Sequence, residues 1–87
     1  MSKNVHVCDD QWHIKKSEKF TWVNNTHNTC NITQGTHPEW PFTSPSYKVP
    51  AGGTLPGETK SDLHDGTYAY EVDCCGPKTM PKNVLVP

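Results

Sequence analysis

The side chains best suited to chemistry in this chain are its four cysteines, Cys8, Cys30, Cys74 and Cys75. An even number of cysteines in a chain of 87 residues favours disulfides and an oxidising compartment. One alternative is a metal site made by all four thiolates, but structural zinc usually takes ligands from C-x2-C pairs, and the chain has none. A second alternative is a redox pair at the adjacent cysteines. However, the chain has no C-x-x-C motif, and no lysine or expected helix start lies beside these cysteines to stabilise a thiolate.

Alternation along the expected strands predicts how the cysteines pair. Cys74 lies in the apolar register of its strand and Cys75 in the polar one. Cys30 shares the inward register of Ile32, whereas Cys8 opposes the register of its apolar neighbours. We therefore expect a Cys30–Cys74 and a Cys8–Cys75 disulfide. A Cys74–Cys75 bridge is the alternative, although vicinal pairs distort the preferred disulfide geometry.

The rest of the composition indicates one small domain over residues 1–87. Only 32% of the residues are hydrophobic, so the core is small and cross-links would help to stabilise it. The net charge is −1, with no basic stripe for a nucleic acid and no apolar run long enough to span a membrane. Residues 1–3 are interpreted as a mature or added N-terminus, from which the signal peptide has been removed. We therefore expect a secreted or periplasmic protein. We also expect it to be a monomer.

Eight Pro and six Gly residues favour short strands joined by turns over long helices. About seven short strands are expected, which is typical of a β-sandwich or barrel. The candidate segments are residues 5–8, 12–15, 20–23, 30–33, 46–49 as an edge strand, 59–63 as a weak strand, 67–72 and 83–86.

Two segments resemble the cupredoxin, or blue-copper, family. Residues 18–25 (EKFTWVNN) look like the strand that leads into the first copper-ligand loop, where the family has a ligand His followed by Asn and this chain has Cys30-Asn31. Residues 65–70 (DGTYAY) look like the strand before the family's ligand Cys, here followed by Cys74 and, six residues later, Met80. The resemblance implies an all-β, Greek-key sandwich.

The ligand positions depart from the family pattern. A blue-copper site takes two imidazoles, one thiolate and a weak axial thioether. The first His position holds Cys30, and no His lies between Cys74 and Met80. We therefore expect no copper cofactor and a disulfide where copper would join the two ligand loops. Copper binding or electron transfer through cysteine thiolates remains the alternative.

The histidines are spread singly and are interpreted as surface residues: His6, His13, His27, His37 and His64. Of these, His27 and His37 flank the presumed ligand loop and could share an ion. His64 precedes Asp65, but the sequence places no nucleophile beside this pair, so no triad is predicted. We expect no catalytic residue and no enzyme.

A loop rich in proline, residues 37–47, carries the remaining binding candidates, Trp40, Phe42 and Tyr47. Rigid aromatic side chains on such a loop make a binding face, or they cover the end of a small core. The second interpretation is favoured for Phe42, and both stay open for the other two. Trp12, Phe20 and Trp22 are assigned to the core.

Three functional hypotheses follow. The first is a copper-free, cupredoxin-like extracytoplasmic domain with a non-catalytic binding or structural role toward a protein or surface ligand that the sequence does not identify. The second is the thiolate copper protein. The third is an engineered variant of such a scaffold.

Overall fold

The computed structural model describes residues 3–75 and 82–86, and all of its regular elements there are β-strands. They are β1 (Lys3–His6), β2 (Gln11–His13), β3 (Lys19–Val23), β4 (Cys30–Thr33), β5 (Tyr47–Val49), β6 (Thr54–Glu58), β7 (Gly66–Val72) and β8 (Lys82–Val86). None of the described residues forms a helix that could serve as a membrane span. The predicted all-β fold is confirmed.

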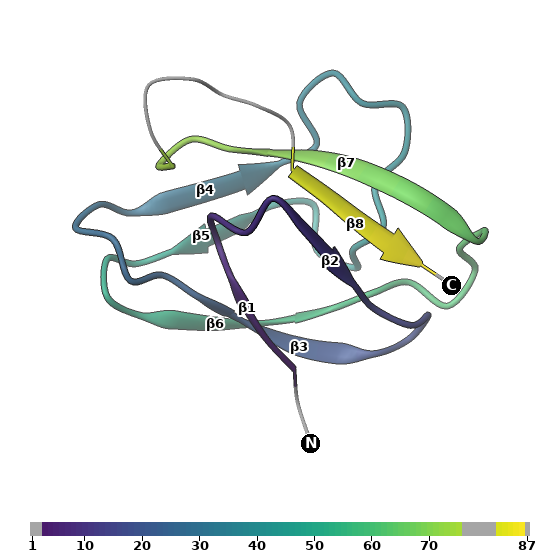
Figure 1. Ribbon diagram of the computed structural model, residues 1–87, viewed down its shortest axis with the longest axis horizontal. Coiled ribbons are helices and arrows are strands. Elements are labelled where there is room, and N and C mark those ends of the chain that lie inside the picture. Colours follow the sequence, from purple (N-terminus) through teal and green to yellow (C-terminus); the bar gives the residue numbers. More distant parts are fainter. Residues whose placement is uncertain (1–2, 76–81, 87) are drawn as a thin grey trace.

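The strands form two sheets that face each other as a sandwich (Figure 1). The smaller sheet has the order β1-β3-β6 and the larger one β2-β8-β7-β4-β5. β1 runs parallel to β3 and β2 parallel to β8, while the other neighbours are antiparallel. β4 and β5 form a hairpin, β5 contacts β6 across the sandwich, and β7 returns beside β4. That is the spatial order of a Greek key. β5 lies at a sheet edge, as predicted for this segment.

Aromatic rings fill the space between the sheets. The ring of Trp22 lies 5.0 Å from Phe20, 5.7 Å from Trp12, 5.6 Å from Phe42 and 5.8 Å from Tyr70, measured between centroids. Trp12 Nε1 donates a hydrogen bond of 2.7 Å to the hydroxyl of Tyr70. Burial raises the pKa of Tyr70 although this hydrogen bond opposes the shift. Such tilted and edge-to-face contacts add to the stabilisation from burial, so the three predicted core aromatics belong to one larger cluster.

The strand expected at residues 59–63 was placed wrongly. The strand in this region is β6, Thr54–Glu58, which pairs with β3 at the edge of its sheet. Pro56 is tolerated there because an edge strand has one side free of ladder hydrogen bonds. At Gly57 a Cβ atom would lie 2.5 Å from Cζ of Phe20, so the absent side chain leaves room for that ring. Pro and Gly are depleted in strands, which is why the segment does not look like one.

Thr59 stabilises a turn by hydrogen bonds and does not lie in a strand. Its buried hydroxyl donates to the carbonyl of Lys15 at 2.7 Å and accepts from the amide of Glu18 at 3.0 Å. Its backbone forms an isolated bridge to Phe42. The residue therefore joins the turn between β2 and β3 to the proline-rich loop.

Candidate functional site

Two adjacent disulfides lie at one end of the sandwich. Cys8 is bonded to Cys75, with 5.4 Å between their Cα atoms, and Cys30 is bonded to Cys74, with 5.1 Å. Cys8 lies just beyond β1, Cys30 begins β4, and the other two cysteines follow β7 after Asp73. The pairing predicted from strand alternation is thus confirmed, and neither the vicinal bridge nor a set of four free thiolates is present.

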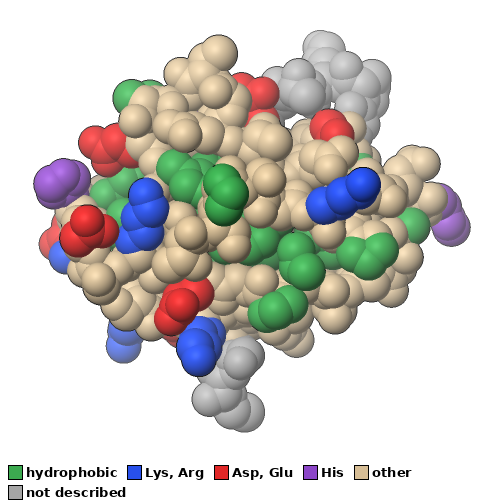
Figure 2. All heavy atoms as spheres, turned by 180° about the vertical axis from the view of Figure 1, so that it is seen from behind, with side chains coloured by type: hydrophobic (Ala, Val, Ile, Leu, Met, Phe, Trp, Pro, Cys, Tyr) green, Lys and Arg blue, Asp and Glu red, His purple; other side chains and the backbone are tan. Residues whose placement is uncertain are grey.

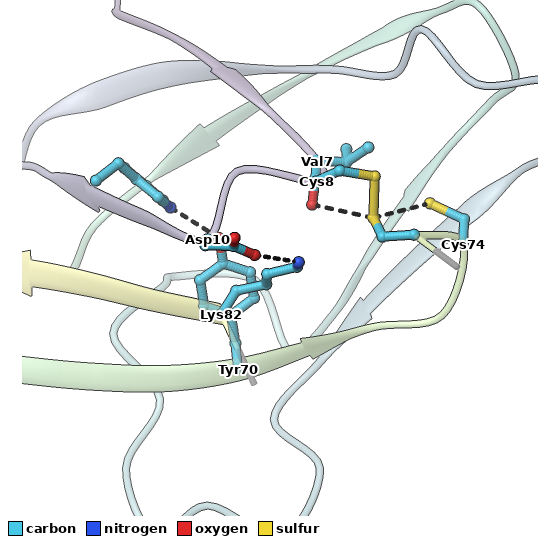
Figure 3. Close-up of polar contacts among 8 residues, drawn as sticks. Val7, Cys8, Asp10, Tyr70, Cys74 and Lys82 are labelled. Carbon is cyan, nitrogen blue, oxygen red and sulfur yellow. Dashed lines mark hydrogen bonds and ion pairs between the residues drawn. A yellow bond between two sulfur atoms is a disulfide. The ribbon is translucent and has the colours of Figure 1, made fainter. Parts of the chain in front are cut away.

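The two disulfides touch each other. The Sγ atoms of Cys74 and Cys75 are 3.7 Å apart, and Sγ of Cys75 lies 3.6 Å from the carbonyl oxygen of Val7 (Figure 3). Cys30 is fully buried, whereas the other three cysteines are only partly buried. The cluster therefore has one sulfur inside the core and three near its rim.

An ion pair lies close to this cluster in the same view (Figure 3). Nζ of Lys82 is 2.7 Å from Oδ1 of Asp10. The lysine side chain is 10% exposed and the aspartate side chain 86%, so the lysine keeps its stem in the protein and its charge at the surface. The amide of Asn83 also donates to the carbonyl of Asp10 at 2.8 Å. These contacts tie the segment after Cys8 to β8.

A buried asparagine shapes the loop that leads to Cys30. The side-chain amide of Asn24 donates to the carbonyls of Asn28, at 2.8 Å, and Val49, at 3.0 Å. Its Oδ1 accepts from the amide of Thr26 at 2.9 Å and from the hydroxyl of the same residue at 2.7 Å. The sequence does not predict this role of Asn24, because nothing in a single sequence separates a buried asparagine from an exposed one.

A hydrogen-bonded pair runs beside the Cys30–Cys74 disulfide. Asp73 accepts from the amide of Asn31 at 2.8 Å through Oδ1 and from the side chain of Asn31 at 2.8 Å through Oδ2. The amide of Asp73 donates back to the carbonyl of Asn31 at 3.3 Å. Hydrogen bonds from Asn31 hold the pKa of Asp73 below its usual 3.8. The chain positions next to both cysteines are therefore fixed without the disulfide itself.

This pair predicts a measurable pH effect. In Asn31→Ala, we expect the pKa of Asp73 to rise toward 3.8, because its strongest donor is removed while the backbone donor remains. Since the folded pKa is lowered, the stabilisation by ionised Asp73 is full above the unfolded pKa and is lost as the pH falls through the folded pKa. NMR titration of the carboxyl carbons measures the shift, with Asn28→Ala as control. An unchanged pKa in Asn31→Ala would show that this hydrogen bond is not formed in solution.

The cluster does not fit the copper that the sequence resemblance implies. Within residues 3–75 and 82–86, one group of three or more His, Cys, Asp or Glu side chains lies close enough to share an ion, namely Cys8, Cys74 and Cys75. It contains no imidazole, and all of its sulfurs are in disulfides. A blue-copper site takes a thiolate and two imidazoles. Met80, the candidate for the axial position, lies outside the described residues.

The histidines do not join this cluster. On the face seen in Figure 2, histidine side chains lie at two opposite edges, and acidic and basic side chains are interspersed between them. His37 is partly buried with Nε2 3.8 Å from Oε2 of Glu71, and the other four histidines are exposed. Asp65 pairs with Lys16 at 3.0 Å, and the carbonyl of His64 accepts from Tyr68, so the two neighbours face separate partners.

The three aromatic residues considered for a binding face differ in how far they are buried. Phe42 is 0% and Tyr47 4% exposed, so both belong to the core: the favoured interpretation of Phe42 is confirmed, and the candidate binding role of Phe42 and Tyr47 is corrected. Trp40 is partly exposed, with Nε1 donating to the carbonyl of Ser44 at 2.6 Å and its ring lying edge-on to Phe42 at 5.0 Å. An open hollow of about 320 Å³ lies against it, and its walls include Trp40, Lys60, Asp62, Leu63 and His64.

Of the comparisons with known proteins, the one with solved structures indicates an architecture. No family model matches the chain, and no curated protein matches it. Among solved structures, an oxidised amicyanin variant aligns with a TM-score of 0.61 at 18% identity, covering 99% of this chain and 82% of that chain. The Cu(I) form of a second amicyanin variant gives 0.60 at 17% identity with the same coverage. At such identities the likeness establishes the fold alone. The chain therefore has an all-β, cupredoxin-like fold, with two disulfides at the end where β1, β4 and β7 meet.

Proposed function

We propose that this chain is a copper-free, extracytoplasmic cupredoxin-like domain whose role is structural or binding and not catalytic. The observation that carries the proposal is the Cys30–Cys74 disulfide. These two residues stand where the sequence resemblance places a ligand His and the ligand Cys. A sulfur bonded to another sulfur is not a thiolate, so the bond between them uses up the donors that copper would need.

The extracytoplasmic part of the proposal rests on redox chemistry. Both disulfides join segments far apart in sequence, with separations of 67 and 44 residues. Structural disulfides of this kind persist in oxidising compartments and are rare where thiols are kept reduced. The non-catalytic part rests on the His64–Asp65 pair, whose members face separate partners: Asp65 pairs with Lys16, and the carbonyl of His64 accepts from Tyr68.

The binding role is placed at Trp40. Its indole is held by the hydrogen bond to Ser44 and by the ring of Phe42, so it presents a rigid edge to the hollow beside it. A preoriented indole loses little conformational entropy on binding, which is why tryptophans often anchor interfaces. The hollow mixes charged and apolar walls, which suits a polar surface ligand or a protein loop.

The decisive experiment adds copper(II) to the oxidised protein and records the visible spectrum beside a count of free thiols. We expect no free thiol and no intense thiolate-to-copper band, because all four cysteines are in disulfides. Weak absorption from copper on exposed histidines is separated from this band by its low intensity, and replacement of the four exposed histidines, His6, His13, His27 and His64, by Ala serves as a control for it. An intense band together with free thiols would overturn the proposal.

A further inference from the structure

We propose that reduction of both disulfides converts Cys8, Cys74 and Cys75 into a three-thiolate site for a thiophilic divalent cation such as Zn²⁺. This inference rests on the positions of the sulfur atoms and is independent of whether the oxidised protein binds copper. Three features of the described residues carry it: the spacing of the sulfurs, the backbone that holds them and their exposure.

The spacing already matches that of a metal-bound thiolate set. The three Sγ atoms lie within 4.8 Å of one another, and those of Cys74 and Cys75 are 3.7 Å apart. Zinc–sulfur bonds of about 2.3 Å in a tetrahedron place two ligand sulfurs about 3.8 Å apart. The adjacent cysteines therefore have the required separation before any movement. Once the two bonds are broken, Cys8 must move away from Cys75 and Cys30 away from Cys74, which requires rotation of these side chains.

The backbone on both sides of the cluster is held by contacts that do not involve sulfur. The amide of Val7 donates to the carbonyl of Val23 at 3.0 Å and fixes the position before Cys8. Asp73, immediately before Cys74, is bonded to Asn31 through both carboxylate oxygens. These contacts do not involve the disulfides, so in reduced protein that is still folded the three thiolates lie near one another.

The exposure distinguishes these three cysteines from the fourth. Cys8, Cys74 and Cys75 are partly buried at the rim, where an ion can enter, whereas Cys30 is fully buried at the start of β4. Cys30 is also outside the group whose sulfurs could share an ion. The site therefore has three protein ligands and a fourth position open to water, in contrast to a closed structural zinc site. With no imidazole it also differs from a blue-copper site.

The conversion is balanced by a dithiol reductant. Each disulfide takes two electrons and two protons from one dithiol, which closes to its own cyclic disulfide, and the bond between the two protein sulfurs is broken. Binding of the cation then releases one proton from each of the three ligating thiols, because the thiolate is the metal ligand. Affinity is therefore expected to rise with pH.

The test uses the whole chain, reduced with dithiothreitol under anaerobic conditions and freed of reductant by gel filtration. Titration with Co²⁺ is expected to give a 1:1 complex with the visible absorption of a tetrahedral thiolate site, which Zn²⁺ then displaces. Near-UV circular dichroism of the aromatic core, recorded on the same samples, is expected to keep its native signal in the metal-bound form. The oxidised protein is expected to give no such absorption.

Two single substitutions separate the proposed ligands from the fourth cysteine. Cys75→Ser is expected to weaken Co²⁺ binding at least 100-fold, whereas Cys30→Ser is expected to change it by less than about threefold. No absorption in the reduced wild type would overturn the site. Equal losses in the two variants would overturn the assignment of ligands. Binding with a flat near-UV spectrum would also overturn it, since thiols of an unfolded chain would then be the ligands.

Discussion

Removal of the Cys30–Cys74 disulfide by Cys30→Ala with Cys74→Ala is expected to lower the free energy of unfolding by about 4 kcal/mol. The bond joins residues separated by 44 positions, and a cross-link of that span restricts the unfolded chain by about 3–4 kcal/mol in the chain-entropy model. The sulfur of Cys30 is also fully buried, and its loss removes roughly 1 kcal/mol of packing and burial. The adjacent Cys8–Cys75 bond keeps the chain ends of this loop close, which reduces the entropic part.

The matched comparison is Cys8→Ala with Cys75→Ala. This bond spans 67 positions, and the longer loop adds only about 0.4 kcal/mol to the entropic part. Cys8 and Cys75 are partly buried, so the packing loss is smaller than at Cys30. The Cys30–Cys74 variant is therefore expected to be the less stable of the two, because burial outweighs loop length.

Urea and thermal unfolding followed by near-UV circular dichroism measure both variants. For a domain of this size, 4 kcal/mol corresponds to a fall in Tm of about 15–30 °C. Such a loss is comparable with the whole stability of many small domains, so partial unfolding at 37 °C is part of the expected result. If the Cys8–Cys75 variant is the less stable one, loop entropy dominates and the account given for Cys30 is wrong.

The fold and the cysteine pairing were predictable where period-2 alternation was undisturbed. In β7 the alternation is long enough to assign an inward and an outward face, and it continues into Cys74 and Cys75. Because each cysteine lies on a defined face, only one pairing joins the two inward cysteines to each other and the two outward cysteines to each other. That pairing is present. Side-chain direction in a strand is a local property, which a single sequence contains.

What could not be predicted depends on contacts between distant segments. β6 contains Pro56 and Gly57, and its strand conformation follows from its edge position and from the ring of Phe20 above the glycine. Phe42 lies in a loop with three prolines and Tyr47 begins β5, and their burial follows from the packing of this loop and strand against the aromatic core. The composition of this segment is compatible both with a cover over the end of the core and with a binding face. Only the packed structure distinguishes the two.

The buried Asn24 is the clearest case of this kind, and its replacement carries the second large effect. Asn24→Ala is expected to lower the free energy of unfolding by about 4 kcal/mol. The substitution removes two donated and two accepted hydrogen bonds, and each contributes about 1 kcal/mol net. It also removes one donor from the carbonyl of Val49, a fully buried residue, which adds to the cost.

The neighbouring Asn25 supplies the control, because it has the same side chain and is exposed. Asn25→Ala is expected to change the free energy of unfolding by no more than about 0.5 kcal/mol. Chemical denaturation measures both variants, and amide hydrogen exchange locates the effect. The amide of Thr26 donates to Oδ1 of Asn24, so its exchange is expected to accelerate in Asn24→Ala and not in Asn25→Ala. Equal stabilities for the two variants would mean that water replaces the lost hydrogen bonds, and the side chain of Asn24 would then not stabilise the loop before Cys30.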